Sequence, residues 1–323
     1  IAPNNDFELS LTVVWQKALK LDRVGIRDDF FDLGGDSLMT VLLVHEMELA
    51  SGIKFDIGDI FSSPTIEQLV ALKQSGKQQA ASSIVPLQEQ GAGVPLFCLC
   101  GINIYQELAD NLGISQPVYG IYVAEEQALM SAVMAGKTSD LSVRHLAQLY
   151  ADAILRKQPE GPYQLAGISF GGLLAIETAS ILKAKGAEVS LVILLDTILP
   201  SGIQRSVLSR IKQPIKGYLS RIKKIVKNNN SKLAEMANLR EQAYIKAMET
   251  YSVSGECYDG QVVLIKAKGH NWGSGVSLKD DYGWGAVINT AISIHEMDGD
   301  HLGIIKKLNV QALADQLKVY FQR

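Results

Sequence analysis

Short apolar runs alternate with helical stretches over residues 85–323, and this alternation constrains the fold more than any other feature. Helical patterns at 142–157 and 172–186 lie between the runs. The runs are nearly continuous in apolar residues, as strands buried on both faces are. The alternation therefore predicts an α/β domain with a mostly parallel sheet. The expected strands are PLFCLC (95–100), PVYGIYV (117–123), YQLAGIS (163–169), VSLVILLD (189–196), QVVLIKA (261–267) and AISIHEM (291–297).

The first 75 residues have a different pattern, with apolar groups at helical intervals over 7–21 and 37–50. A third helix is expected in SSPTIEQLVALKQ, where Ser63 can cap the helix, Pro64 suits its first turn and Glu67 lies near capping-box range. This part predicts a compact all-α bundle of three or four helices.

A polar stretch of small residues, GKQQAASS, separates the two patterns and is typical of a linker. We therefore expect a helical domain at 1–76, a linker at 77–84 and an α/β domain at 85–323. Residues 200–255 contain no strand-like run, and residues 202–232 carry nine Lys or Arg and no acidic residue. We interpret 200–255 as a helical insertion.

Composition limits the kinds of partner. The 323-residue chain has a net charge of −3, which argues against bulk nucleic-acid binding. No apolar run approaches the roughly 20 residues that span a bilayer. The three cysteines are too few for a disulfide framework and are not spaced as zinc ligands, so we expect no metal and a reducing cytoplasm. The chain begins at Ile1 without a secretion signal, as a piece of a longer polypeptide would.

The sequence Gly167-Ile168-Ser169-Phe170-Gly171 matches G-x-S-x-G between an expected strand and an expected helix. Glycines allow the tight turn that exposes the serine hydroxyl. A serine nucleophile needs a base, and the base needs a group that orients it. Asp196 ends the strand VSLVILLD and would lie at the carboxyl edge of the sheet, which makes it the candidate for the orienting group.

The candidate base is His301, which follows the last expected strand on a loop, in the order Ser, Asp, His that α/β-hydrolases use. His270, before a glycine-rich stretch, is the alternative. The other histidines fit less well, because one lies in the helical domain, one precedes the serine and one lies within a strand: His45, His145 and His295. Cys98, Cys100, Tyr282 and Trp284 are expected to pack locally.

A second serine lies at the start of a helix, in Asp32-Leu33-Gly34-Gly35-Asp36-Ser37-Leu38. A helix N-terminus favours negative charge, so a phosphate ester on Ser37 would be stabilised there. On geometry alone, a plain helix cap explains the same residues.

The sequence FFDLGGDSL, followed by a helix and FSSPTIEQLVAL, resembles the peptidyl carrier domains of nonribosomal peptide synthetases over about residues 7–75. The resemblance implies a small four-helix bundle in which Ser37 carries a 4′-phosphopantetheine arm attached by a phosphopantetheinyl transferase. Polyketide acyl carriers share much of this pattern, so the class of cargo stays open.

Residues 85–323 resemble the type I thioesterase domains that end such synthetases, through PLFCLCG, QPVYGI, GISFGG, the strand ending in Asp196, and GDH. The resemblance implies an α/β-hydrolase fold, a helical lid at about 200–255, and an oxyanion hole at the backbone N–H groups of Ile102 and Phe170. The loop after the first strand, CGINIY, is shorter and poorer in glycine than in many relatives. This departure leaves the Ile102 donor and the shape of the substrate channel open.

Together the two resemblances imply chain release. Upstream modules would load an acyl or peptidyl thioester on the arm of Ser37, and Ser169, His301 and Asp196 would transfer and release it by hydrolysis or cyclisation. The basic stretch 202–232 could meet the acidic helical domain, since residues 1–78 carry a net charge of −5. Three alternatives stay open: release of a polyketide or fatty-acyl chain, a proofreading hydrolase, and a catalytically idle docking module.

Overall fold

The computed structural model describes residues 1–35, 37–75, 84–121, 123, 142–200, 244, 247–248, 251, 257–269, 279–306 and 308–321, without the side chains of residues 37, 38, 41 and 42. The expected insertion at 200–255 and the alternative base His270 lie almost wholly outside these residues. So does the expected linker, except Ile84, which is the first residue of a strand. Contacts divide the chain into two compact units, with a boundary between Val85 and Pro86.

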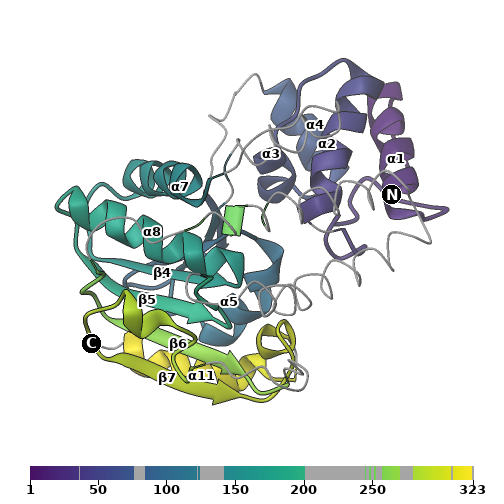
Figure 1. Ribbon diagram of the computed structural model, residues 1–323. Coiled ribbons are helices and arrows are strands. Elements are labelled where there is room, and N and C mark those ends of the chain that lie inside the picture. Colours follow the sequence, from purple (N-terminus) through teal and green to yellow (C-terminus); the bar gives the residue numbers. More distant parts are fainter. Residues whose placement is uncertain are drawn as a thin grey trace. The chain divides into compact units, whose positions relative to one another are not determined.

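The first unit contains the expected all-α bundle (Figure 1). Its core includes Trp15 and Phe30, both fully buried, whose rings meet edge to face with centroids 5.2 Å apart. Asn5 caps the first helix by accepting a hydrogen bond from the Glu8 N–H. The helices are α1 (Asp6–Leu19), α2 (Ser37–Ser51), α3 (Ile57–Ser62) and α4 (Ile66–Gln74).

Helix α4 begins two residues later than expected, so the assignment of Ser63 as its cap is wrong. Thr65 is the N-cap, and it forms a capping box with Gln68: the Gln68 N–H donates to Thr65 Oγ1 and the Thr65 N–H donates to Gln68 Oε1. Pro64 lies outside the helix, where its carbonyl accepts from the Phe30 N–H at 2.8 Å. That bond ties the start of α4 to the loop before α2.

The second unit is built on a seven-stranded sheet of order β1-β3-β2-β4-β5-β6-β7. Every strand pair from β3 through β7 is parallel, which confirms the predicted mostly parallel sheet. Parallel strands place their carboxyl ends along one edge, and side chains that follow the strands therefore gather there. The strands are β1 (Ile84–Gln88), β2 (Leu96–Leu99), β3 (Val118–Ile121), β4 (Tyr163–Ile168), β5 (Val189–Leu195), β6 (Val262–Ala267) and β7 (Ile292–Met297).

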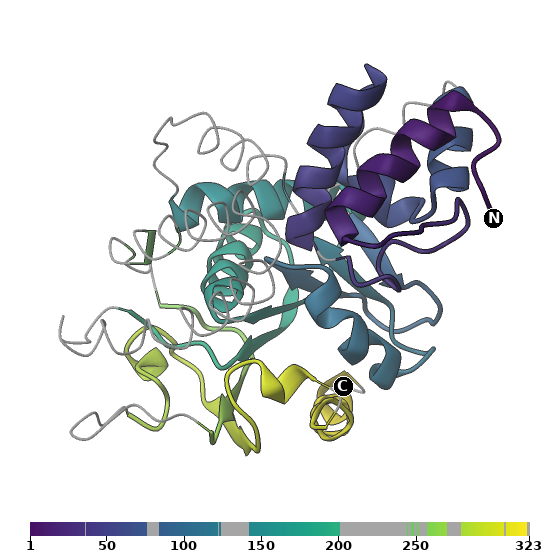
Figure 2. The same cartoon turned by 90° about the vertical axis from the view of Figure 1, so that its right-hand side faces the viewer.

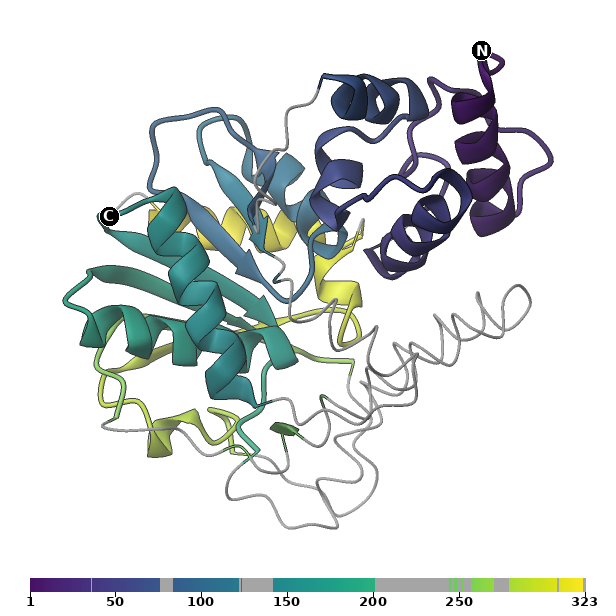
Figure 3. The same cartoon turned by 90° about the horizontal axis from the view of Figure 1, so that it is seen from above.

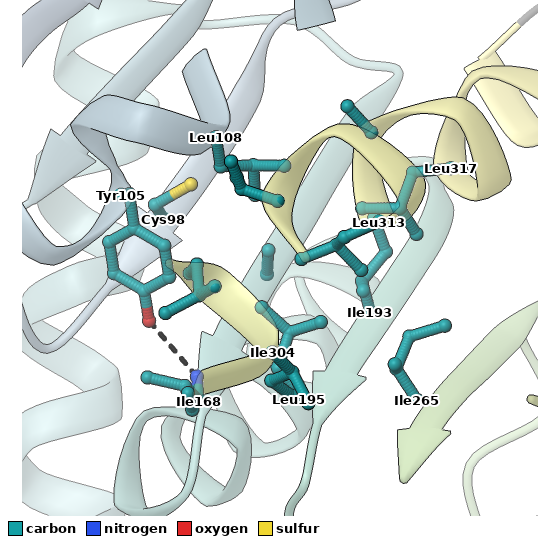
Figure 4. Close-up of a cluster of buried hydrophobic side chains, with 14 of the residues drawn as sticks. Cys98, Tyr105, Leu108, Ile168, Ile193, Leu195, Ile265, Ile304, Leu313 and Leu317 are labelled. Atoms are coloured by element: carbon teal, nitrogen blue, oxygen red, sulfur yellow. Dashed lines mark hydrogen bonds between the residues drawn. The ribbon is translucent and has the colours of Figure 1, made fainter. Parts of the chain in front are cut away.

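Helices cover both faces of this sheet (Figures 2 and 3). Helices α7 (Val143–Lys157) and α8 (Phe170–Ala184) pack together on one face, and α5 (Gln106–Leu112) and α11 (Val310–Phe321) pack together on the other. Figure 4 shows the cluster beneath α5 and α11, where strand side chains meet helix side chains such as Leu108 and Leu313. Each such large apolar side chain contributes about 1.5–3 kcal/mol by leaving water.

The described residues of the second unit also form short 3₁₀ helices: η1 (Asn103–Tyr105), η2 (Trp284–Ala286) and η3 (Gly303–Ile305). Within the described part of the chain, every helix is too short or too polar to cross a membrane.

The helical unit contains one nearly buried ion pair whose removal should destabilise it. Asp59 accepts hydrogen bonds from Lys73 Nζ at 2.5 Å and from the Asp56 N–H at 2.8 Å, and its side chain is 8% exposed. We expect Asp59→Asn to lower the free energy of unfolding by about 3 kcal/mol, because it leaves the Lys73 ammonium, whose side chain is only 20% exposed, without its counter-charge. Hydrogen-exchange mass spectrometry of peptides from residues 56–74 measures the change.

The matched control is Glu46→Gln, which removes the Lys17–Glu46 contact of 3.9 Å between far more exposed groups. That change should alter stability by less than about 0.5 kcal/mol. Equal protection in both variants would show that burial does not strengthen the Asp59 pair.

Candidate active site

Ser169 lies at the junction between β4 and α8 in a strained backbone conformation, with φ 56° and ψ −119°. A non-glycine residue at positive φ persists only when its surroundings hold it there. Part of that support is a hydrogen bond from the Ser169 N–H to the carbonyl of Leu195, at 3.0 Å. The bond places Ser169 beside Leu195, the last residue of β5, which directly precedes Asp196.

Three glycines make this turn sterically feasible. A Cβ on Gly167 would lie 2.0 Å from the Gly171 carbonyl oxygen, and one on Gly172 would lie 2.0 Å from Thr197 Oγ1. A Cβ on Gly171 would lie 2.7 Å from the Leu99 carbonyl oxygen. The first turn of α8 therefore packs directly against the ends of β2 and β5, at a separation that only glycine allows.

Asp196 follows β5 with φ 46°, and its carboxylate is almost completely buried. Its N–H donates to the Ile265 carbonyl at 2.7 Å, and its Oδ1 accepts from the Ala267 N–H at 2.9 Å. The other oxygen, Oδ2, lies 2.6 Å from Nδ1 of His301. The end of β6 thus fixes the carboxylate while leaving one oxygen for the imidazole.

His301 reaches Asp196 from the loop after β7, as the sequence predicted, and its side chain is 12% exposed. A carboxylate can only accept, so Nδ1 of His301 carries a proton, and the neutral form of the ring has its lone pair on Nε2. The loop is held by a hydrogen bond from the Gly269 N–H to the Gly299 carbonyl at 2.8 Å and by one from Asn309 Nδ2 to the Gly303 carbonyl at 2.9 Å.

Two residues that we expected only to pack locally form hydrogen bonds to Asp196 and to the next residue, Thr197. The Tyr282 hydroxyl donates to Asp196 Oδ1 over 3.4 Å, and Trp284 Nε1 donates to the Thr197 carbonyl at 2.7 Å. Burial and the nearby Asp196 charge raise the pKa of Tyr282, which keeps its hydroxyl protonated and able to donate at neutral pH. Their separation from Asp196 by about 90 residues left no local signal of this role.

The two expected oxyanion donors follow β2 and β4. Ile102 is buried and precedes η1, and Phe170 is the first residue of α8, where helical N–H groups have no intrahelical partner. Because Gly171 comes so close to Leu99, the two backbone segments are neighbours. Cys100 follows Leu99, and a Cβ on Gly171 would lie 3.3 Å from the Cys100 Cβ. The Cys100 thiol contacts the Tyr244 hydroxyl at 3.8 Å. Burial raises the pKa of the Cys98 thiol, which packs in the core as expected.

In the helical unit, Ser37 is the first residue of α2. The preceding turn has Gly34 at φ 95°, and a Cβ on Gly35 would lie 2.3 Å from the ring of Phe30. The first turn of α2 has no acidic side chain. A phosphate diester on Ser37 would therefore meet the positive end of the helix dipole without repulsion from that turn, so the local structure fits a phosphopantetheine arm.

Comparison with protein families accounts for both regions. Residues 97–319 match the family model described as a thioesterase domain, and residues 10–72 match the phosphopantetheine attachment site. The chain belongs to the thioesterase domain family. Its thioesterase domain follows a carrier domain, as the sequence indicated.

Relatives with both regions are much longer synthetases. The chain is 30% identical over 365 aligned residues to chondramide synthase of Chondromyces crocatus, covering 98% of this chain and 9% of that protein. It is 28% identical to malpibaldin synthetase of Mortierella alpina, covering 99% of this chain and 6% of that protein. The chain thus spans less than a tenth of the length of either relative.

Solved structures show the same fold. A four-domain nonribosomal peptide synthetase bound to AMP and glycine matches the whole chain with a TM-score of 0.61 and 24% identity, over 26% of its own length. The NocB thioesterase domain from the nocardicin cluster matches 75% of the chain, and 99% of its own length, with a TM-score of 0.57 and 19% identity. Within the described residues, no group of three His, Cys, Asp or Glu could hold a metal ion.

The glycines of the Ser169 turn generate a test. We expect Gly167→Ala to lower the free energy of unfolding of the thioesterase domain by about 1–3 kcal/mol, because the new methyl group overlaps the Gly171 carbonyl. The turn should also lose its geometry, and labelling of Ser169 by a fluorophosphonate should stop. Thermal unfolding and intact-protein mass spectrometry measure the two effects.

Gly186→Ala is the control at the far end of α8. Gly186 has φ 82° but no atom within 4 Å of a new Cβ, so the change should destabilise by about 1 kcal/mol while labelling continues. Normal labelling of Gly167→Ala would contradict the close-approach argument.

Proposed function

We propose that this chain releases an acyl or peptidyl chain from a nonribosomal peptide synthetase, by transfer to Ser169 followed by hydrolysis or intramolecular cyclisation. The strongest support is the 2.6 Å hydrogen bond between His301 and a buried Asp196, next to the strained turn that presents Ser169. An attachment site for a thioester-bearing arm precedes this site in the same chain. The combination is specific to chemistry on carrier-bound thioesters.

In the first half-reaction, Ser169 Oγ attacks the thioester carbonyl carbon while His301 Nε2 takes the hydroxyl proton. Asp196 stabilises the resulting imidazolium and keeps it oriented. The N–H groups of Phe170 and Ile102 stabilise the negative oxygen of the tetrahedral intermediate. The C–S bond then breaks, the thiolate takes the proton from His301, and an ester on Ser169 remains.

In the second half-reaction, His301 removes a proton from the incoming nucleophile. Attack by water gives a free acid, whereas attack by a hydroxyl or amine of the chain itself gives a ring. His301 returns its proton to Ser169 Oγ as the ester C–O bond breaks. The same oxyanion donors serve both halves.

Ser37 is the attachment point for the arm, which supplies a thiol on which the acyl group is held as a thioester. We infer a phosphopantetheinyl transferase as a partner, since the serine hydroxyl needs this modification, and upstream synthetase modules as the source of the acyl or peptidyl chain. The net charge of −3 gives no reason to expect nucleic-acid binding. Three free cysteines favour the reducing cytoplasm.

Mass spectrometry of the loaded arm tests the proposal. The protein is treated with a phosphopantetheinyl transferase and an acyl-coenzyme A, and the acyl group is followed by peptide mapping. We expect it to attach at Ser37, to disappear from wild type, and to persist in Ser169→Ala. Ser37→Ala, the matched control, should never load.

Three results would contradict the proposal. Loss of the acyl group at equal rates in wild type and Ser169→Ala would exclude Ser169 as the nucleophile. Retention in both proteins, over a set of acyl groups of different length, would favour the idle docking module. Slow release of short acyl groups of many kinds would favour the proofreading hydrolase.

A further inference from the structure

One buried hydroxyl joins the two strands that lead to the proposed oxyanion donors. Tyr105 is completely buried, and its hydroxyl accepts a hydrogen bond from the Ile168 N–H at 3.0 Å (Figure 4). The same hydroxyl donates a hydrogen bond to the Leu99 carbonyl at 2.9 Å. Leu99 is the last residue of β2 and Ile168 is the last residue of β4. The phenol therefore links the carboxyl ends of two neighbouring strands.

The Tyr105 hydroxyl forms its hydrogen bonds at the point where regular pairing between β2 and β4 ends. The β2–β4 register ends at the pair Leu99 and Gly167. The next residue on β2 is Cys100, with φ 61°, and the residue after Ile168 is Ser169, with φ 56°. Each hydrogen bond of the hydroxyl thus holds the residue immediately before a strained one.

Tyr105 is also tied directly to both donor segments. Its own N–H donates to the Ile102 carbonyl at 3.0 Å within η1. On the other side, a Cβ on Gly171 would lie 3.4 Å from the Tyr105 hydroxyl oxygen, so the first turn of α8 packs against the same group. Its ring is buried in the cluster beneath α5 and α11, which fixes the position of the hydroxyl.

We propose that Tyr105 is a positioning residue for the oxyanion hole: its hydroxyl sets the separation between the backbone N–H groups of Ile102 and Phe170. Tyr105 does not touch substrate. It acts by holding two backbone segments at the spacing that a tetrahedral oxyanion requires. The inference depends on the proposed function, because it takes Ile102 and Phe170 as the donors.

If the Tyr105 hydroxyl only stabilised the fold, its removal would change kcat and Ki no more than removal of another buried tyrosine hydroxyl. Tyr163 is the matched control for this comparison. Tyr163 is also completely buried, and its hydroxyl donates to the Gln158 carbonyl at 2.7 Å. Tyr163 lies at the first residue of β4, the end opposite to Ile168. Tyr163→Phe therefore removes a hydroxyl from the same strand, but away from the proposed oxyanion hole.

The experiment compares Tyr105→Phe with Tyr163→Phe in the full chain. The readouts are melting temperature, kcat and KM for a short N-acetylcysteamine thioester, and Ki for a trifluoromethyl ketone. Ser169 adds to that ketone, forming a C–O bond, and its proton goes to His301 while the carbonyl electron pair becomes an oxyanion. Ki thus reports on the oxyanion hole without turnover.

We expect both variants to melt at lower temperature. Misplacement of catalytic groups by about 1 Å lowers rates by about 100-fold, so Tyr105→Phe should lower kcat by about 10- to 100-fold. KM should stay within about threefold, and Ki for the ketone should rise by about the same factor as kcat falls. Tyr163→Phe should keep kcat and Ki within about twofold of wild type.

A second substitution covers the case in which Tyr105→Phe does not fold. Replacement of Tyr105 by 4-aminophenylalanine keeps a donor for the Leu99 carbonyl but gives a poorer acceptor for the Ile168 N–H. We expect this variant to have kcat and Ki values between those of wild type and those expected for Tyr105→Phe. Wild-type kcat and Ki in this variant would overturn the inference.

The remaining outcomes separate the two proposals. If Tyr105→Phe and Tyr163→Phe lower kcat equally, or if kcat falls in Tyr105→Phe without any change in Ki, the positioning role is wrong. If Ser169→Ala retains the thioesterase activity of wild type, the proposed function itself fails. An inactive Ser169→Ala beside a fully active Tyr105→Phe overturns only the inference.

Discussion

The close approach of α8 to the ends of β2 and β5 is the constraint on which the rest of the site depends. Because residues 167, 171 and 172 are glycines, the start of α8 approaches the end of β4, the Leu99 carbonyl and the Thr197 side chain more closely than a Cβ would allow. The turn forces Ser169 to φ 56°, and the hydrogen bond from its N–H to Leu195 anchors it to β5. The backbone that presents the serine is therefore held by packing on both sides rather than by its own preference.

The parallel sheet brings the other groups to the same edge. Asp196 follows β5, His301 lies on the loop after β7, and the Ile102 segment follows β2. The hydrogen bond between Asp196 and His301 joins residues that are 105 positions apart along the chain. Both oxygens of the buried Asp196 carboxylate have hydrogen-bond partners. The Ala267 N–H and the Tyr282 hydroxyl donate to Oδ1, and His301 Nδ1 donates to Oδ2. A buried carboxylate with defined partners can orient a base without moving during the reaction.

The sequence predicted the two folds and their order well, because apolar runs of strand length and helical periodicity are local signals. It also predicted His301 as the histidine beside Asp196, from chain order and loop placement. It missed the start of α4, because Thr65 with Gln68 competes with Ser63 for the same cap. It missed Tyr282 and Tyr105 as well, since a hydroxyl that reaches another strand leaves no trace in spacing. Such contacts arise only when the sheet is assembled.

A crystal structure of the protein after reaction with an acyl-mimicking fluorophosphonate tests the central claim most directly. The account predicts phosphorus bonded to Ser169 Oγ, with fluoride lost, and a phosphonyl oxygen within hydrogen-bonding distance of the N–H groups of both Phe170 and Ile102. His301 should keep its contact with Asp196. Phosphorus on another residue, or a phosphonyl oxygen directed away from both N–H groups, would contradict the account.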